Sequence, residues 1–355
     1  MSSNARTRRG VCAGIVAAAF ALAAPAAAQE QIKLTIAAGH PPIFLWVKHL
    51  KESFVATIDA ELAKGGKHRV VWNEAYGGTL AKIGSELETM QQGISDVGIV
   101  ATVFQSAKMP LNNVTYFVPY GPADANVVTS AIDKVQALPE LTAEWHKHNL
   151  VYLAGFAIDN YGLATSFPIT KFEDLKGRKI GGAGPNLAWF KNTGAVGVQG
   201  SLNTFYTDIK TGVYEGAIAF VTSAVPAKLY EVAPHFTVVS MGAMYAGAVA
   251  INKSRWDKFA PEVQAAFRKG AAGYREAYLK EQTARIAAAT DAWKKSGGKM
   301  TELAPAEQAR LVKAIPNPTE EWIKQAGPPA KNVLAAYMDS VRATGFKFQR
   351  DFDKE

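Results

Sequence analysis

Apolar residues recur along the chain in two alternating patterns. Short runs of neighbouring apolar residues are typical of buried strands, and longer stretches show the three-to-four-residue spacing of an amphipathic helix. Glycines stand at most junctions, as Gly65 and Gly66 do after the first helix-like stretch. The first part of the chain is predicted as strand 32–38, helix 43–62, strand 69–74, helix 81–92 and strand 96–103.

The stretch from Phe172 to Phe220 repeats this alternation and says most about function. It contains three short apolar runs, at 179–180, 196–198 and 217–220. The two segments between these runs have helical spacing. This order predicts β-α-β-α-β and therefore a parallel sheet. The loops beyond the carboxyl ends of such strands lie beside helix amino termini with unpaired N–H groups, where ligands bind. Two loops have that position, 181–186 and 200–204.

The rest of the chain contains predicted strands and a helix that are too long to fit within one compact domain. A helix is predicted over 133–147, and an extended run over 150–165 is broken near Asp159 and Asn160. That run exceeds an ordinary strand, so it is expected to cross between two domains, as is the run 236–252. Pro261 to Lys295 is predicted as one helix of about 50 Å, which should brace both domains. The tail, 302–345, is expected to form two or three short helices.

The amino-acid sequence of the central stretch resembles that of a known family. Pro168-Ile169 followed by Phe172-Glu173-Asp174-Leu175-Lys176-Gly177-Arg178-Lys179-Ile180 is similar to a signature of the periplasmic solute-binding proteins of TRAP transporters (the DctP-like family). Tyr206 followed by Gly212-Val213-Tyr214-Glu215-Gly216 is similar to a second family motif. The resemblance runs over almost the whole chain after residue 28.

The resemblance implies a two-lobed α/β periplasmic binding protein with hinge strands and a long helix spanning both lobes. On that basis residues 29–153 form lobe I, to which 242–275 return. Residues 154–241 form lobe II, which 276–355 complete while bracing both lobes. The two crossing runs are expected to be the hinges.

The amino terminus has the features of a cleavable export signal. Arg6, Arg8 and Arg9 precede an apolar run, Val11 to Ala24, and small residues follow it up to Ala28. Residues 1–28 are therefore predicted to be a signal peptide, and the mature protein a soluble periplasmic one. Sec export is expected, with twin-arginine export as the alternative.

Composition excludes several classes of protein. The only cysteine lies in the predicted signal, so no disulfide is expected in the mature chain. The formal charge of +8 falls to +5 without the three signal arginines, and the other basic residues are scattered among acids. No nucleic-acid footprint is present. With 48% hydrophobic residues, the chain can bury large cores.

No catalytic grouping is recognised, and neither a cofactor nor a metal ion is expected. Gly181 to Gly184 lacks the spacing of a dinucleotide loop and is interpreted as a tight turn before a helix. His146 and His148 do not share a helix face, which favours a solvated helix end over a metal pair. An enzyme is therefore the weaker interpretation, and turnover of a bound acid would be needed to revive it.

One departure from the family pattern shapes the predicted site. The resemblance implies an arginine directly after Ile180 that clamps the ligand carboxylate, and Gly181 stands there instead. Neutral donors and helix amino termini are therefore expected to bind the acid group. The candidate ligand-binding residues are His40, Thr79, Lys82, Asn160, Tyr161, Gly182, Asn186, Trp189, Asn203, Thr204, Phe220 and Tyr245.

Six of the candidates have a plainer alternative. His40 follows the first strand but is equally explained as a hydrogen-bonded loop histidine. Lys82 would replace the missing cation or else be a surface lysine. Tyr161, Trp189, Phe220 and Tyr245 are placed toward the cleft, where each is also explained as core.

The predicted ligand is an aromatic or otherwise apolar monocarboxylate, because two buried carboxylates would need cations that the expected positions do not offer. The alternative is a C4-dicarboxylate held by relocated cations such as Lys82. The predicted mechanism is hinge closure of a monomer that delivers its ligand to the small and large membrane subunits of a TRAP permease. A role in sensing is not separated from transport by sequence.

Overall fold

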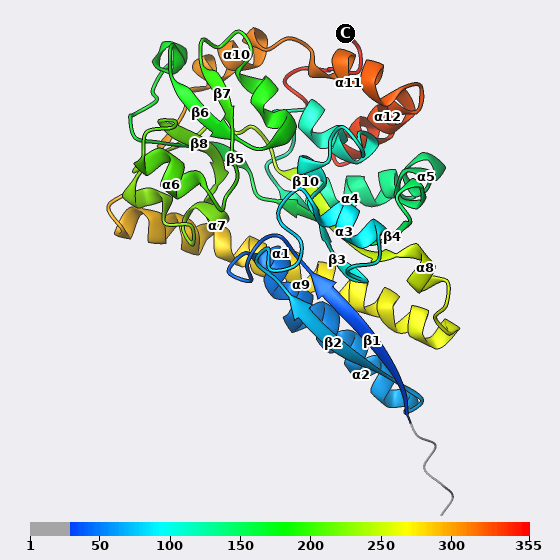
Figure 1. Cartoon of the computed structure of the whole chain (residues 1–355). Helices are drawn as coiled ribbons and strands as arrows, with labels where there is room; N and C mark the ends of the chain where they lie inside the picture. The colour runs from blue at the N-terminus through cyan, green and yellow to red at the C-terminus, as the bar shows by residue number, and fades with distance from the viewer. Residues whose placement is uncertain (1–28) are drawn as a thin grey trace, which may run out of the picture.

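The computed structural model describes residues 29–355, so the predicted signal peptide lies outside the described residues. Two β-sheets form the framework (Figure 1). We call the part built on the first sheet lobe I. Its strands, in spatial order, are β2 (His68–Ala75), β1 (Glu30–Ala37), β3 (Val97–Val100), β10 (Met244–Asn252) and β4 (Leu150–Ile158). β1 pairs parallel with β2 and β3, and β10 runs antiparallel to β3 and β4.

Lobe II is built on the second sheet. Its strands, in spatial order, are β11 (Lys299–Glu302), β9 (His235–Val238), β5 (Tyr161–Thr165), β8 (Gly216–Phe220), β6 (Lys179–Gly182) and β7 (Val196–Gln199). β6 pairs parallel with both β7 and β8, as the alternation of the central stretch predicted. β5 is antiparallel to β8 and β9. The predicted fold class, a two-lobed α/β protein, is confirmed.

Two connections cross between the sheets at the predicted places. β4 leads into β5 through Asp159 and Asn160, and β9 leads into β10 through the segment 239–243. The crossings are hydrogen-bonded to each other: Tyr161 N donates to Gly242 O at 3.1 Å, and Met241 N donates to Tyr161 O at 3.2 Å. Gly242 N also donates to Asn160 Oδ1 at 2.9 Å. The crossings therefore form one paired connection that both lobes share.

Asp159 gives this connection a buried carboxyl group. Its Oδ1 and Oδ2 accept hydrogen bonds from Thr222 Oγ1 (2.5 Å) and Thr222 N (3.3 Å), at the start of α7 (Val221–Ala224) in lobe II. Burial raises the pKa of Asp159 from its ordinary value of 3.8 to about 6. A carboxyl whose pKa is raised by folding favours the folded state below its unfolded pKa and loses that contribution as pH rises through the folded pKa.

Asp159→Asn is therefore expected to flatten the pH dependence of unfolding between about pH 4 and pH 6. The pKa difference corresponds to about 3 kcal/mol of stability that wild type loses over this window. Urea unfolding of both proteins at pH 4.5 and pH 7 measures the effect. An equal fall in both proteins would show that Asp159 does not carry it.

The long helix was predicted with correct bounds. α9 runs from Pro261 to Lys295 over 35 residues. It packs on α2 (Ala56–Gly65), β4 and the π-helix Leu50–Val55 of lobe I, and on α7 and β11 of lobe II. In Figure 1 it runs across the width of the molecule, from beside α7 of lobe II to the side of lobe I near α8. Gly270 allows close packing, because a Cβ there would lie 2.6 Å from Ile58 Cγ1.

The tail packs on both lobes. It forms three helices, α10 (Pro305–Ala314), α11 (Pro318–Ala326) and α12 (Pro329–Arg342). α10 packs on the 3₁₀ helix Phe172–Leu175 of lobe II. α12 packs instead on α4 (Ala125–Gln136) and on the 3₁₀ helix Leu111–Phe117 of lobe I. The segment 276–355 was predicted to complete lobe II while bracing both lobes, and its last two helices cover lobe I (Figure 1).

Several predicted elements of lobe I are shorter or divided. The helix expected over 81–92 is only α3 (Glu86–Gln91), because Gly84 before it is left-handed with φ of 82°. The strand expected over 96–103 ends at Val100 and continues as the 3₁₀ helix Thr102–Phe104. The helix expected over 133–147 is divided into α4 and α5 (Pro139–Lys147), since Pro139 has no N–H and begins a new helix.

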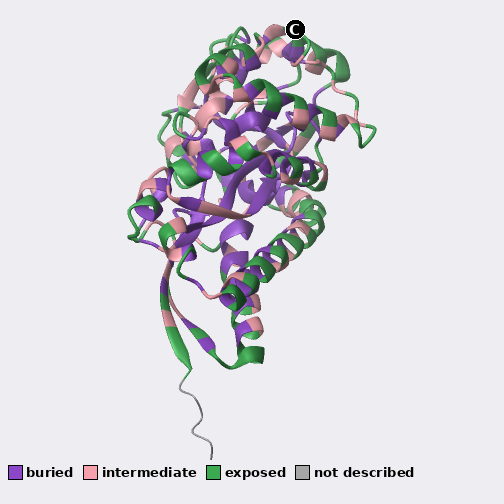
Figure 2. Ribbon diagram, turned by 90° about the vertical axis from the view of Figure 1, so that its right-hand side faces the viewer, coloured by how far each residue is buried: buried purple, intermediate pink, exposed green. Residues whose placement is uncertain are grey.

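The first predicted helix also has an irregular interior. α1 (Leu45–His49) and α2 are joined by the π-helix Leu50–Val55, and Gly66 ends α2 in the left-handed conformation with φ of 65°. π-helical turns are frequent at functional sites. Short helices complete the fold: α6 (Phe205–Lys210), α8 (Lys253–Trp256), and the 3₁₀ helices Gly184–Phe190 and Leu229–Glu231. Buried residues gather in the middle of the molecule, and helices carry exposed residues on its outside (Figure 2).

Candidate ligand-binding cavity

A cavity lies between the two lobes and takes its walls from both. Lobe I contributes the loop after β1, the start of α1, the segment after β3, the 3₁₀ helix Leu111–Phe117, and β4 and β10. Lobe II contributes β5, β8, the loops after β6 and β7, and the start of α6. The lining residues are His40, Trp46, Ala101, Val103, Phe104, Tyr116, Phe156, Ile158, Tyr161, Ala183, Leu202, Phe205, Ile218, Phe220 and Ala246.

The cavity is small in the arrangement of the lobes seen in this structure. The volume of the cavity that water-sized spheres can occupy is about 40 Å³. By the usual requirement of about 10–15 Å³ for each water molecule, that is room for about three. An organic ligand therefore needs the lobes to separate or the lining side chains to shift as it enters.

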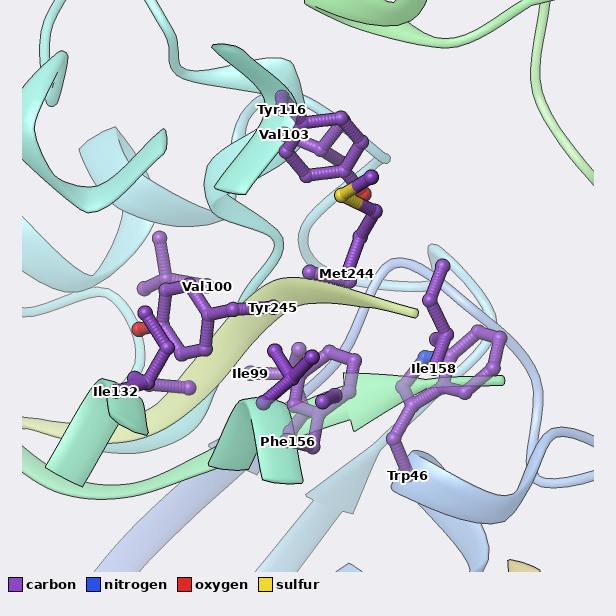
Figure 3. Packing of buried hydrophobic residues seen from close by; sticks show 14 of the residues in the cluster. Trp46, Ile99, Val100, Val103, Tyr116, Ile132, Phe156, Ile158, Met244 and Tyr245 are labelled. Atoms are coloured by element: carbon purple, nitrogen blue, oxygen red, sulfur yellow. The ribbon is translucent and has the colours of Figure 1, made fainter. Parts of the chain in front are cut away.

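Trp46 forms the wall on the side of lobe I. Its ring is stacked between Phe44 (centroids 5.0 Å apart, planes at 6°) and Phe156 (5.7 Å, 8°). Tyr274 Oη from α9 donates to the Trp46 carbonyl oxygen at 3.0 Å. The Trp46 Nε1 donor is buried and has no hydrogen-bond partner. In Figure 3 the indole lies beside Ile158 of the lining.

His40 extends this wall from the loop after β1. Its ring meets the ring of Trp46 edge-on at 5.3 Å and is tilted against Phe104 at 6.3 Å. The side chain is 5% exposed, and Nδ1 has no hydrogen-bond partner. Burial lowers the pKa of His40 to about 4, so the imidazole is neutral at neutral pH.

Tyr161 and its neighbours form the wall on the side of lobe II. The Tyr161 ring meets Phe220 edge-on at 5.5 Å and Trp189 edge-on at 5.7 Å. Its hydroxyl lies 3.4 Å from the hydroxyl of Tyr116, which belongs to lobe I. Burial raises the pKa of Tyr161 and holds its hydroxyl in the protonated form. Asn186, 1% exposed, leaves both atoms of its amide without a partner.

The lobes touch beside the cavity. Trp189 Nε1 in lobe II donates to Tyr116 O in lobe I at 2.8 Å, and their rings are stacked at 6.0 Å. Gly184 begins the 3₁₀ helix after β6 with φ of 55° and lies so close to Val103 that a Cβ would overlap the Val103 carbonyl oxygen. This conformation brings the two walls together.

Three of the predicted site residues line the cavity, namely His40, Tyr161 and Phe220. Trp189 and Asn186 are buried directly behind Tyr161. Gly182 lies beside Asn186, since a Cβ on it would be 2.6 Å from Asn186 Oδ1. The structure thus brings these six residues together, and their contact with a ligand stays a prediction.

The other predicted site residues lie elsewhere. Thr79 and Lys82 are exposed on the irregular segment before α3, and Thr79 Oγ1 donates to Tyr76 O. Asn203 and Thr204 are exposed before α6. Asn160 is engaged with Gly242 in the crossing. None of these five is among the lining residues.

Tyr245 points away from the cavity. Neighbours on a strand alternate in direction, and Ala246 is the one that reaches the lining. Tyr245 packs beside Ile132 of α4 (Figure 3), and its hydroxyl donates to Asn112 Oδ1 at 3.3 Å. It belongs to the core of lobe I, the alternative that its sequence position left open.

Apart from His40, sequence reasoning missed the residues on the lobe I side of the cavity. Trp46 lies three residues after Ile43 and four before Leu50, on the apolar face of the predicted helix, so its spacing did not distinguish it from a core residue. Val103 and Phe104 were placed in or after a predicted strand, whose 3₁₀ ending was not foreseen.

The lining carries no Lys, Arg, Asp or Glu. Among the described residues, no group of three His, Cys, Asp or Glu side chains is arranged to hold a metal ion. What the cavity offers is aromatic and aliphatic surface with a few neutral polar groups. Two lobes that share paired crossings and enclose such a cavity define a binding protein for a small solute.

Comparisons with known proteins place this binding protein in a family. The model of bacterial extracellular solute-binding protein family 7 (DctP) matches residues 47–325. A solute-binding protein of Albidiferax ferrireducens is 24% identical over 196 residues, 55% of this chain and 57% of that protein. The chain thus matches little more than half the length of this relative.

Several solved structures have a similar fold, and the similarity extends over nearly the whole length of those chains. A marine metagenome TRAP solute-binding protein specific for pyroglutamate has a TM-score of 0.76 at 20% identity, over 87% of this chain and 99% of that one. A Bordetella pertussis extracytoplasmic solute receptor binding pyroglutamic acid has 0.75 at 19%, over 86% and 99%. A Chromohalobacter salexigens TRAP protein with bound D-glucuronate has 0.76 at 16%, over 86% and 99%.

At these identities the structures establish the fold, and the family model establishes the kinship. The chain belongs to bacterial extracellular solute-binding protein family 7, the solute-binding proteins of TRAP transporters. Members of this family are periplasmic proteins of transport systems and not enzymes. In the described part of the chain, no helix is long and apolar enough to cross a membrane.

Proposed function

We propose that this protein captures a small organic acid with an aromatic or otherwise apolar body in the periplasm. It then delivers the acid, as a monomer, to the membrane subunits of a TRAP permease. The lining of the interlobe cavity carries this proposal, because it is apolar apart from neutral groups on His40, Trp46, Tyr116 and Tyr161. Apolar surface that both lobes contribute favours a ligand whose body is buried by both.

Closure follows from the same arrangement. A ligand that contacts both walls stabilises the state in which they meet, and the paired crossings 159–160 and 239–243 are the connection about which the lobes would turn. The contacts of Trp189 with Tyr116 then stabilise the closed form. The permease would recognise that form.

The cavity favours a monocarboxylate over a C4-dicarboxylate. Two carboxylates would bring two charges into a space whose lining has no cationic side chain, and Lys82 lies outside it. An unpaired buried carboxylate is strongly disfavoured. Fold neighbours that bind pyroglutamate or glucuronate are examples of monocarboxylate binding on this framework.

A ligand panel tests the proposal. Thermal shift and calorimetry are run with 3-phenylpropionate, phenylpyruvate, benzoate, pyroglutamate, glucuronate and succinate. At least one apolar monocarboxylate is expected to raise the melting temperature and bind at least tenfold more tightly than succinate, because a ligand that binds only the native state stabilises it. Tight binding of succinate with no binding of the aryl acids would contradict the proposal.

A further inference from the structure

The cavity poses an electrostatic problem for the ligand class proposed above. An ionised carboxylate would enter a space lined by apolar groups and by no charged side chain. Hydrogen bonds from neutral donors offset only part of the lost hydration, and a full opposite charge offsets far more. One lining group can acquire such a charge, the imidazole of His40.

The geometry of His40 suits this role. The ring forms part of the cavity wall, and its Nδ1 has no partner in the protein. Its immediate neighbours are the rings of Phe44, Trp46 and Phe104, so no salt bridge competes for it. We infer that His40 takes up a proton when a monocarboxylate binds and becomes the cation that pairs with it, in place of the missing arginine.

The proton balance is simple. The free site holds neutral imidazole, and the ligand arrives as an anion. One proton from solvent adds to an imidazole nitrogen, so the bound pair carries no net charge and no covalent bond to the ligand forms. A nearby opposite charge favours the protonated form. Raising the pKa of His40 from about 4 to 7 requires the carboxylate to bind imidazolium about 1000-fold more tightly than imidazole.

Other titratable groups near the cavity could also exchange a proton when a ligand binds. Tyr116 and Tyr161 across the cavity have raised pKa values because they are buried, and they stay protonated. Glu86 on α3 packs against Gly39, and burial raises its pKa to about 8. Its Oε2 accepts from Gly84 N at 2.6 Å, and its Oε1 has no partner. Lys82, on the segment before α3, is exposed. Asp159, in the crossing beside Tyr161, has its pKa raised by burial to about 6. Glu86 and Asp159 are therefore competing proton sites, and each needs its own control.

Proton-linked binding is measured by calorimetry at pH 6 in buffers of different ionisation enthalpy. The inference rests on the proposed function, and the probe is the tightest monocarboxylate of 3-phenylpropionate, phenylpyruvate, benzoate and pyroglutamate. Wild type is expected to take up close to one proton for each ligand, and its affinity to fall up to tenfold per pH unit between pH 5 and pH 7. Binding of the matching primary amide is expected to be independent of pH.

Three variants assign the proton. His40→Gln, which keeps a neutral donor, is expected to abolish proton uptake and weaken acid binding while amide binding changes little. Glu86→Gln and Asp159→Asn are each expected to retain the uptake. Acid binding without proton uptake would overturn the inference alone, as would uptake that survives in His40→Gln or disappears in Glu86→Gln or Asp159→Asn. No binding by any of the four acids would instead overturn the proposed function, and this inference with it.

Discussion

Gly184→Ala is expected to weaken ligand binding at least a hundredfold while the protein remains folded. The new Cβ would overlap the carbonyl oxygen of Val103 across the interlobe contact, so the walls of the cavity cannot meet as they do here. Closure is the step that buries the ligand, and its loss removes the contacts of one whole wall. Calorimetry gives the affinity, and small-angle scattering shows whether the ligand still compacts the protein.

Gly212→Ala is the matched control for this substitution. Gly212 is also in lobe II and also left-handed, with φ of 77°, but no atom lies within 4 Å of the position of a Cβ. Both variants meet the same backbone strain of about 1 kcal/mol, and only Gly184→Ala meets the opposite lobe. Affinity in Gly212→Ala is expected to stay within about twofold of wild type. Equal losses in the two variants would contradict the closure account.

Trp46→Ala is expected to cost about 3–5 kcal/mol of unfolding free energy and to abolish measurable ligand binding. The indole is 4% exposed and fills the stack between Phe44 and Phe156, so its removal leaves a large void in the wall. Denaturant unfolding and calorimetry measure the two effects. Trp256→Ala, which removes a buried indole of lobe I packed on Phe259 and Phe267, is expected to lose stability but keep ligand affinity.

Trp46→Phe separates the ring from its N–H group. Phenylalanine keeps an aromatic ring in the stack and removes a buried donor that has no protein partner. An unpaired buried donor is itself costly, so stability is expected to stay near that of wild type. Acid binding is expected to weaken about tenfold because a donor to the carboxylate is lost. Unchanged affinity in Trp46→Phe would show that the indole N–H does not contact the ligand.

The fold was largely predictable from local patterns. The order of strands and helices, the parallel pairing around β6, the two crossings and the bounds of α9 all follow from apolar spacing, glycine and proline. The errors lie where local preference competes with other forces. Pro139 divides one predicted helix, and Gly84 delays the start of another. The strand predicted to reach residue 103 ends at Val100, and the 3₁₀ helix Thr102–Phe104 follows at the cavity.

The site was less predictable because a cavity wall depends on which side chains from distant elements face one another. His40, Tyr161 and Phe220 were found because they follow or lie on strands that lead to the cleft. Tyr245 was predicted to face the cleft, but its neighbour Ala246 faces the cavity instead. Side chains of successive strand residues point in opposite directions, so an error of one position reverses the predicted direction. Trp46 was missed because its role depends on stacking against Phe156, more than a hundred residues away.

The structure of the protein with the compound that co-purifies with it, identified by mass spectrometry, tests the central claim most directly. We expect a monocarboxylate between the lobes, its apolar body against the Trp46 ring and Phe220, its acid group against His40 and the Trp46 N–H, and no arginine or lysine in contact. An arginine or lysine gripping the acid group, or a compound held outside this cavity, would contradict it.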